Sequence, residues 1–293
     1  MNHKLTRRRF GQLALTSTAV AGLSYFANQT FAQTPHPTLI GVHSLPQTPT
    51  SRRLTLQSSN PITGRVQPLA APEFLPNGTP LLNHREQLSG LTSFKDGTLV
   101  LAITSMGLYP QEATVTRLTI LSQSPKSFEL SGLHPQEALQ SLLVSDDGQL
   151  LGLVARKGSR PPARIVKIHP KTGKLSDSNL LQLPKHQRFI TLSQGPDGTL
   201  YTLSVSSLGA TSLVQLDWRQ KRPVVLAPLK FNNQVWTHGM SSLVCSASGQ
   251  FFALGNAKNE SPKHVYAINP HSGSMTKLMP FDVAKITHRT FTA

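Results

Sequence analysis

A short pattern of apolar and polar positions recurs along the chain at a nearly constant interval. Four turn sequences end in Asp-Gly or Ser-Gly, and their glycines stand 51, 50 and 51 residues apart. These glycines are Gly97, Gly148, Gly198 and Gly249. A leucine stands six residues before each of them, and an apolar residue stands two residues after it. Each repeat is therefore predicted to hold two apolar strands joined by a tight hairpin, since Asp-Gly tolerates the positive φ that such a turn needs.

Further apolar segments complete each repeat. A third strand is expected at 117–121, 165–168, 213–216 and 265–268, and a fourth strand closes each unit, for example at 274–279. Four antiparallel strands in each repeat of about fifty residues are typical of a β-propeller blade. The sequence thus predicts an all-β fold, a β-propeller of four-stranded blades.

The two ends of the chain are expected to share one blade. Residues 39–45 and 53–56 fit second and third strands, residues 65–69 fit a fourth, and a lone apolar strand at 286–291 supplies the missing innermost one. Such pairing closes the ring and leaves no exposed strand edge at the junction. This arrangement gives about five blades. A sixth remains an alternative if residues 46–87 contain a degenerate blade.

One repeat carries a family resemblance. The run Gln194-Gly195-Pro196-Asp197-Gly198-Thr199-Leu200-Tyr201 resembles the repeat of a broad propeller group that includes virginiamycin B lyase-like and NHL-like proteins. The resemblance implies the propeller fold. It implies no particular activity, because propellers carry many unrelated functions.

The N-terminus is predicted to be an export signal. Thr6-Arg7-Arg8-Arg9-Phe10 resembles the twin-arginine consensus, a weakly apolar stretch covers 13–27, and a small-residue cleavage site ends at Ala32. The apolar stretch is too short and too polar to favour the alternative of a membrane anchor. We therefore expect a signal peptide at 1–32, a single propeller domain at 33–293, and export to the periplasm or an equivalent lumen.

Charge points to the kind of partner. The formal net charge is +16, from 29 Lys and Arg against 13 Asp and Glu. Such an excess attracts anionic surfaces. For an exported chain, expected to be a monomer, these are an acidic protein, an anionic polymer or a membrane surface rather than nucleic acid. The candidate docking patch comprises Arg156, Lys157, Arg160, Arg164, Arg219, Lys221 and Arg222. The alternative is that these residues are ordinary solvated turns.

A histidine recurs in the loops that lead into the innermost strands. The five positions are His84, His134, His186, His238 and His288, separated by 50, 52, 52 and 50 residues. Their spacing favours a ring of histidines near the channel mouth, where imidazoles can bind a divalent metal, act in acid–base catalysis or contact a ligand directly. Inherited loop residues without a functional role are the alternative.

Two functional hypotheses follow. The first is a non-catalytic binding or assembly scaffold with a basic surface for an acidic protein or anionic ligand. The second is an enzyme, a lyase or a metal-dependent one, that uses the histidines at the channel mouth. Glycoside hydrolysis is disfavoured, because it needs a carboxylate pair and Glu86 and Glu137 are the only acids close to innermost strands. No cofactor is predicted, although a divalent metal at the histidines stays open.

Overall fold

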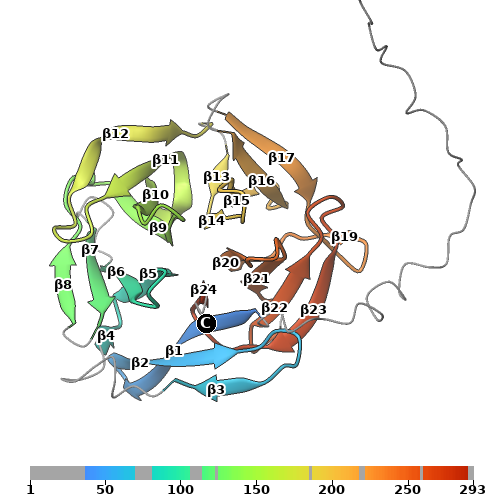
Figure 1. The fold of residues 1–293 in the computed structure, drawn as a ribbon, viewed down its shortest axis with the longest axis horizontal. Helices are drawn as coiled ribbons and strands as arrows, with labels where there is room; N and C mark the ends of the chain where they lie inside the picture. The colour runs from blue at the N-terminus through green and yellow to red at the C-terminus, as the bar shows by residue number, and fades with distance from the viewer. Residues whose placement is uncertain are drawn as a thin grey trace, which may run out of the picture. The chain divides into compact units, whose positions relative to one another are not determined.

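The computed structural model describes residues 37–69, 81–105, 114–122, 125–184, 187–217, 222–257 and 260–289. Within these ranges, five antiparallel sheets form a ring (Figure 1), and the helical structure is limited to the 3-10 turn η2 (Lys157–Ser159). The predicted all-β propeller with five blades is confirmed. No helix in this part of the chain is long and apolar enough to cross a membrane.

The blades follow one another along the chain. Blade 1 comprises β24 (Lys285–Arg289), β1 (Thr38–Thr48), β2 (Ser51–Ser59), β3 (Val66–Pro68) and β4 (Leu81–Asn83). Blade 2 comprises β5 (Glu86–Ser93), β6 (Leu99–Ser105), β7 (Val115–Leu121) and β8 (Lys126–Glu129). Blade 3 comprises β9 (Glu137–Val144), β10 (Leu150–Arg156), β11 (Arg160–Ile168) and β12 (Leu175–Gln182).

Blade 4 has a broken innermost strand, and a short ribbon follows it. The blade comprises β13 (Arg188–Phe189), β14 (Ser193–Gln194), β15 (Leu200–Val205), β16 (Thr211–Asp217) and β17 (Arg222–Pro228). The ribbon pairs β18 (Lys230–Phe231) with β19 (Gln234–Val235). Blade 5 comprises β20 (Met240–Cys245), β21 (Phe251–Gly255), β22 (His264–Ile268) and β23 (Met275–Pro280).

The chain ends close the ring as predicted. Strand β24 pairs antiparallel with β1, with Leu39 opposite His288 and Val42 opposite Lys285. Strands β3 and β4 both pair with β2, at its two ends. The described strands between residues 46 and 83 therefore belong to blade 1, β5 of blade 2 begins at Glu86, and the alternative of a sixth blade is wrong.

The hairpin turns also follow the prediction. Their four glycines have φ between 78° and 83°, in the left-handed region where a side chain is strained. One expected loop is shorter than the sequence indicated. The third strand of blade 3 was expected at 165–168, but β11 already begins at Arg160 and leaves η2 as the turn. A bulge between Ala155 and Arg156 shifts the register there, next to two prolines that cannot donate to a regular ladder.

The hydrophobic core lies between neighbouring blades. Each of five buried clusters combines side chains from two adjacent blades. In β6, Leu99, Leu101 and Ile103 pack towards blade 1, whereas Val100 and Ala102 pack towards blade 3. Because both faces of such a strand are covered, its sequence is a continuous apolar run and not an alternating one.

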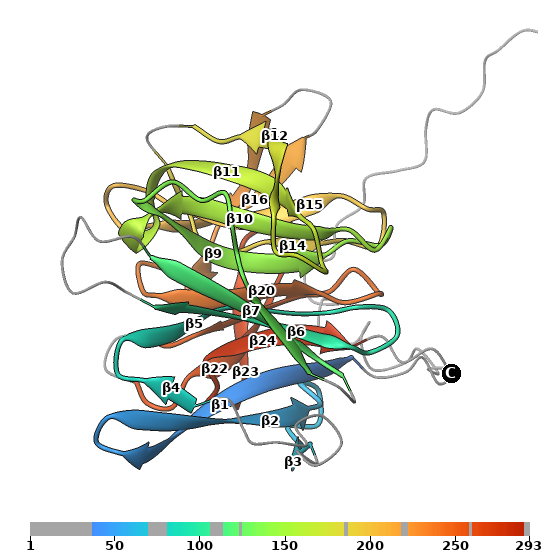
Figure 2. The same cartoon turned by 90° about the vertical axis from the view of Figure 1, so that its left-hand side faces the viewer.

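The innermost strands share one direction around the channel. Each runs from an inter-blade loop, and in blades 2 to 5 it ends at a hairpin turn. Figure 2 shows the ring from the side. We call the end where these strands begin the mouth, and the other end the hairpin face.

Candidate functional site

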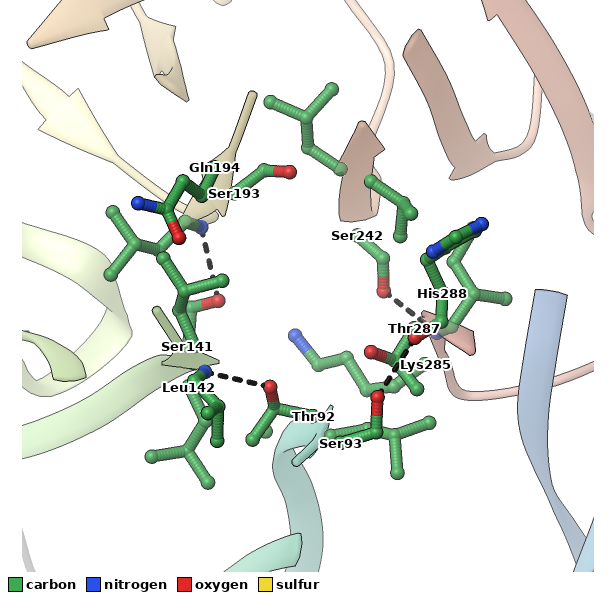
Figure 3. Close-up of a pocket in the computed structure, with 18 of the residues that line it drawn as sticks. Thr92, Ser93, Ser141, Leu142, Ser193, Gln194, Ser242, Lys285, Thr287 and His288 are labelled. Atoms are coloured by element: carbon green, nitrogen blue, oxygen red, sulfur yellow. Dashed lines mark hydrogen bonds between the residues drawn. The ribbon is translucent and has the colours of Figure 1, made fainter. Parts of the chain in front are cut away.

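A belt of hydrogen bonds joins the innermost strands across the five blade junctions (Figure 3). Four of the bonds run from a backbone N–H to a hydroxyl: Val144 to Thr92 Oγ1 (2.9 Å), Leu192 to Ser141 Oγ (3.1 Å), Cys245 to Ser193 Oγ (2.9 Å) and Ile286 to Ser242 Oγ (3.1 Å). In the fifth, Ser93 Oγ donates to the carbonyl oxygen of His288 at 2.8 Å. The inner edge of a blade has no further strand to pair with. These hydroxyls satisfy backbone groups that would otherwise be left unpaired there.

Two cavities divide the channel. The mouth cavity, of about 690 Å³, is lined by the first residues of all five innermost strands. The inner cavity, of about 380 Å³, is lined by the later residues of these strands and reaches the hairpin face. Lys285 and Ser241 line both cavities. They therefore lie where the two halves of the channel meet.

Lys285 carries its amino group into the channel. Figure 3 shows the amino group extending into the space that the belt residues enclose. Its Nζ donates a hydrogen bond to the carbonyl oxygen of Ser241 at 2.8 Å. Burial and, to a smaller extent, the nearby Lys263 ammonium lower the pKa of Lys285 to about 8. The channel thus holds an amine that titrates close to physiological pH.

Three more cations line the mouth cavity: Arg52, Arg188 and Lys263. Both arginines are exposed. Lys263 Nζ donates to the carbonyl oxygen of Ala284 at 3.4 Å, and burial lowers its pKa against the opposing attraction of Asp282. Among the described residues, neither these three cations nor Lys285 forms an ion pair.

One described carboxylate, Glu86, lines the mouth cavity. It is already engaged, since it accepts the backbone N–H of Asn83 at 3.0 Å and lies 3.6 Å from the guanidinium of Arg117. The mouth therefore offers converging cations and hydrogen-bond donors, which is an arrangement suited to an anion.

The structure places the four described histidines of the predicted ring at different locations. His238 lines the mouth cavity and packs edge-on against Trp236, with ring centroids 5.3 Å apart. His288 lines the inner cavity, and burial lowers its pKa. His84 is exposed, and its Nε2 accepts a hydrogen bond from Arg85 Nε at 3.1 Å.

The two remaining histidines lie apart from the channel cavities or outside the described ranges. His134 lines a separate cavity of about 950 Å³ together with Glu137 and Arg164. His186 lies outside the described residues. In the part of the chain that the structure describes, no three His, Cys, Asp or Glu side chains come close enough together to hold a metal ion.

The predicted basic patch is divided between the two ends of the ring. Arg156, Lys157 and Arg160 lie on the mouth side, where Arg156 stands opposite Glu137 in the backbone register of β10 and β9. Arg222 starts β17 opposite Asp217, at the hairpin face. Arg219 and Lys221 lie outside the described residues.

Arg164, the remaining patch residue, is committed to a partner inside the fold. Its Nε and Nη2 donate to the two carboxylate oxygens of Glu137 at 2.9 and 2.7 Å. Burial raises the pKa of Glu137, but the bonds from Arg164 and from the His134 backbone N–H outweigh it and hold the pKa below its usual value. This fork joins β11 to the start of β9, so Arg164 acts as a structural residue.

Sequence reasoning missed Lys263 and Lys285. The sequence held one weak indication of the position of Lys285. It directly precedes the apolar run expected at 286–291, and an innermost strand that closes the ring must start at the mouth. Lys263 lies in a loop that no repeat pattern marks, and its approach to the channel depends on the packing of blade 5 against blade 1.

Comparisons with known proteins support the fold. A scan of family models and a search of curated proteins found no match. A Dyadobacter fermentans protein of unknown function aligns at 10% identity over 84% of both chains, with a TM-score of 0.50. TolB from Acinetobacter baumannii aligns at 16% identity over 84% of this chain and 54% of its own, with a TM-score of 0.47.

An enzyme is among the similar structures too. The periplasmic gluconolactonase of Pseudomonas aeruginosa aligns at 16% identity over 85% of this chain and 69% of its own, with a TM-score of 0.41. The present chain thus spans about half of TolB and about two thirds of the gluconolactonase. At these identities the likeness concerns the fold alone. The chain is a five-bladed β-propeller.

Proposed function

We propose that this protein is a non-catalytic binding propeller that receives an acidic protein segment at the mouth of its channel. The observation that carries the proposal is the set of four cations around the mouth cavity, Arg52, Arg188, Lys263 and Lys285, beside one carboxylate that is already paired. A concave site lined by one sign of charge concentrates the field and favours a ligand of the opposite sign.

The shape of the site favours a protein segment over a membrane or a stiff polymer. The cavity of about 690 Å³ at the centre of the ring admits a projecting loop or a few side chains, whereas a flat anionic surface reaches only its rim. The exposed forks of Arg52 and Arg188 suit carboxylates, which they can bind through two parallel hydrogen bonds. Export by the twin-arginine pathway, expected from the N-terminal sequence, belongs to the same proposal and would bring the propeller to a periplasmic partner.

A labelled oligoglutamate peptide tests the proposal by fluorescence anisotropy. The double variant Arg52→Gln/Arg188→Gln removes two charges from the mouth. The matched control Lys171→Gln/Arg222→Gln removes two charges from exposed positions on the hairpin face. We expect the mouth variant to weaken binding at least tenfold, or by about 1.4 kcal/mol. The control should stay close to wild type.

Added salt should weaken the wild-type complex strongly, because exposed charges are screened. Equal weakening by the two double variants would mean that the peptide responds to overall charge and not to the mouth. Binding that ignores salt would contradict the electrostatic basis of the proposal.

A further inference from the structure

The interior of the channel differs chemically from its mouth. Its inner cavity is lined mainly by small hydroxyl side chains and apolar residues, with the Lys285 amino group reaching in from the mouth side (Figure 3). Lys285 uses one N–H in its bond to the Ser241 carbonyl oxygen. A protonated amine has three, so two donors remain for another acceptor.

The belt hydroxyls provide more unused donors. Thr92, Ser141, Ser193 and Ser242 each accept one backbone N–H and line the inner cavity. A hydroxyl that accepts one bond still carries its own proton for donation. Within the described ranges, none of the four donates that proton to a protein acceptor. The belt therefore surrounds the cavity with donors whose oxygen atoms the backbone already holds in place.

The charged groups around Lys285 leave its ammonium without a counterion. On the mouth side, Lys263, Arg52, Arg188 and His238 face the same cavity, and Glu86 lies at its rim in contact with Arg117. On the inner side, Lys95, Asp146 and His288 line the cavity, and Asp146 belongs to a turn at the hairpin face. A buried charge without a partner is unfavourable, and a bound anion would relieve this cost.

We propose that the channel binds one small oxyanion, a carboxylate or a phosphate group, at Lys285 between the mouth and inner cavities. The site goes beyond the mouth function proposed above, because hydroxyls of the inner cavity and not the exposed arginines complete it. The inner volume of about 380 Å³ lies near the lower end of small-molecule sites, which span roughly 300–1,000 Å³. It therefore suits a metabolite-sized anion.

Inorganic phosphate is the probe, and its binding is measured by isothermal titration calorimetry at constant ionic strength. Lys285→Met removes the ammonium and keeps the length of the side chain. Lys171→Met, on an exposed outer turn, is the matched control. We expect saturable binding to wild type and to Lys171→Met, and at least tenfold weaker binding to Lys285→Met. Acetate in place of phosphate, and oligoglutamate added in competition, show whether a free anion or a peptide carboxylate occupies the site.

A second measurement needs no variant. The Nζ of Lys285, followed by nitrogen NMR in wild-type protein, should titrate at a higher pH with phosphate present, because the anion stabilises the charged amine. An unchanged titration would overturn the proposal, as would equal phosphate binding by all three proteins or no binding in the millimolar range.

The test separates this site from the proposed mouth function. Loss of phosphate binding in Arg52→Gln/Arg188→Gln, with Lys285→Met unaffected, would place the anion at the mouth and refute the channel site. If oligoglutamate does not bind, the proposed mouth function fails. Phosphate binding that still depends on Lys285 would then support the channel site by itself.

Discussion

Replacing Lys285 by methionine should stabilise the propeller near neutral pH and lose this advantage in alkali. Burial, with a smaller contribution from the nearby Lys263 ammonium, lowers the pKa of Lys285 from 10.5 to about 8 in the folded protein. A lysine with a depressed folded-state pKa binds its proton more weakly in the folded than in the unfolded chain. At pH values between the folded-state and unfolded-state pKa, unfolding therefore takes up a proton. The free energy of unfolding rises with pH across this range.

The size of the effect follows from the shift. One pKa unit corresponds to about 1.4 kcal/mol, so keeping Lys285 charged in the folded channel costs about 3 kcal/mol at neutral pH. Roughly 2 kcal/mol of this cost disappears by about pH 9.5, where the folded amine is neutral and the unfolded one is still mostly charged. The stability difference between Lys285→Met and wild type should shrink by that amount.

Urea unfolding in phosphate-free buffer measures this difference, because an anion bound at Lys285 would raise its pKa and mask the effect. Wild type, Lys285→Met and the exposed-site control Lys171→Met are compared at about pH 7 and about pH 9.5. A stability difference for Lys285→Met that does not change with pH would refute the reasoning. The same change in Lys171→Met would show that general charge repulsion and not burial is responsible.

Three further predictions concern the belt, the blade junctions and export. Ser193→Ala leaves a buried backbone N–H of the next blade unpaired and should cost about 1–3 kcal/mol in urea unfolding, whereas the exposed Ser207→Ala should be neutral. Gly273→Ala should cost more than about 2 kcal/mol in the same assay, because its φ is 71° and a Cβ would lie 2.0 Å from a carbonyl oxygen of the neighbouring blade. Arg7→Lys/Arg8→Lys should leave the protein in the cytoplasm on cell fractionation, and unchanged export would argue against the twin-arginine pathway.

The fold could be predicted because its determinants are local and repeated. Turn chemistry at Gly97 and its counterparts, with apolar runs on both sides, marks each hairpin. A lone strand left at the C-terminal end then implies closure with the first strands. What could not be predicted is the start of β11 at Arg160, since a bulge beside two prolines is fixed by pairing with β10 and not by the local pattern.

The site was harder to predict, because equal spacing along the chain does not guarantee equal depth in the channel. His84 and His238 each stand two residues before an innermost strand, but His288 is the fourth residue of β24. At about 3.3 Å per residue, the offset between the start of β24 and His288 amounts to about 10 Å along the channel. Lys285 therefore occupies the mouth position in blade 1, and His288 lies towards the hairpin face.

Hydrogen–deuterium exchange on the wild-type protein, with and without oligoglutamate, tests the central claim that the mouth is the binding face. The claim predicts protection at the starts of the innermost strands, in residues 82–88, 137–140, 237–241 and 284–285, with the hairpin turns at 94–98, 145–149, 195–199 and 246–250 unchanged. Protection confined to those hairpin turns would place the ligand on the opposite face and contradict the account.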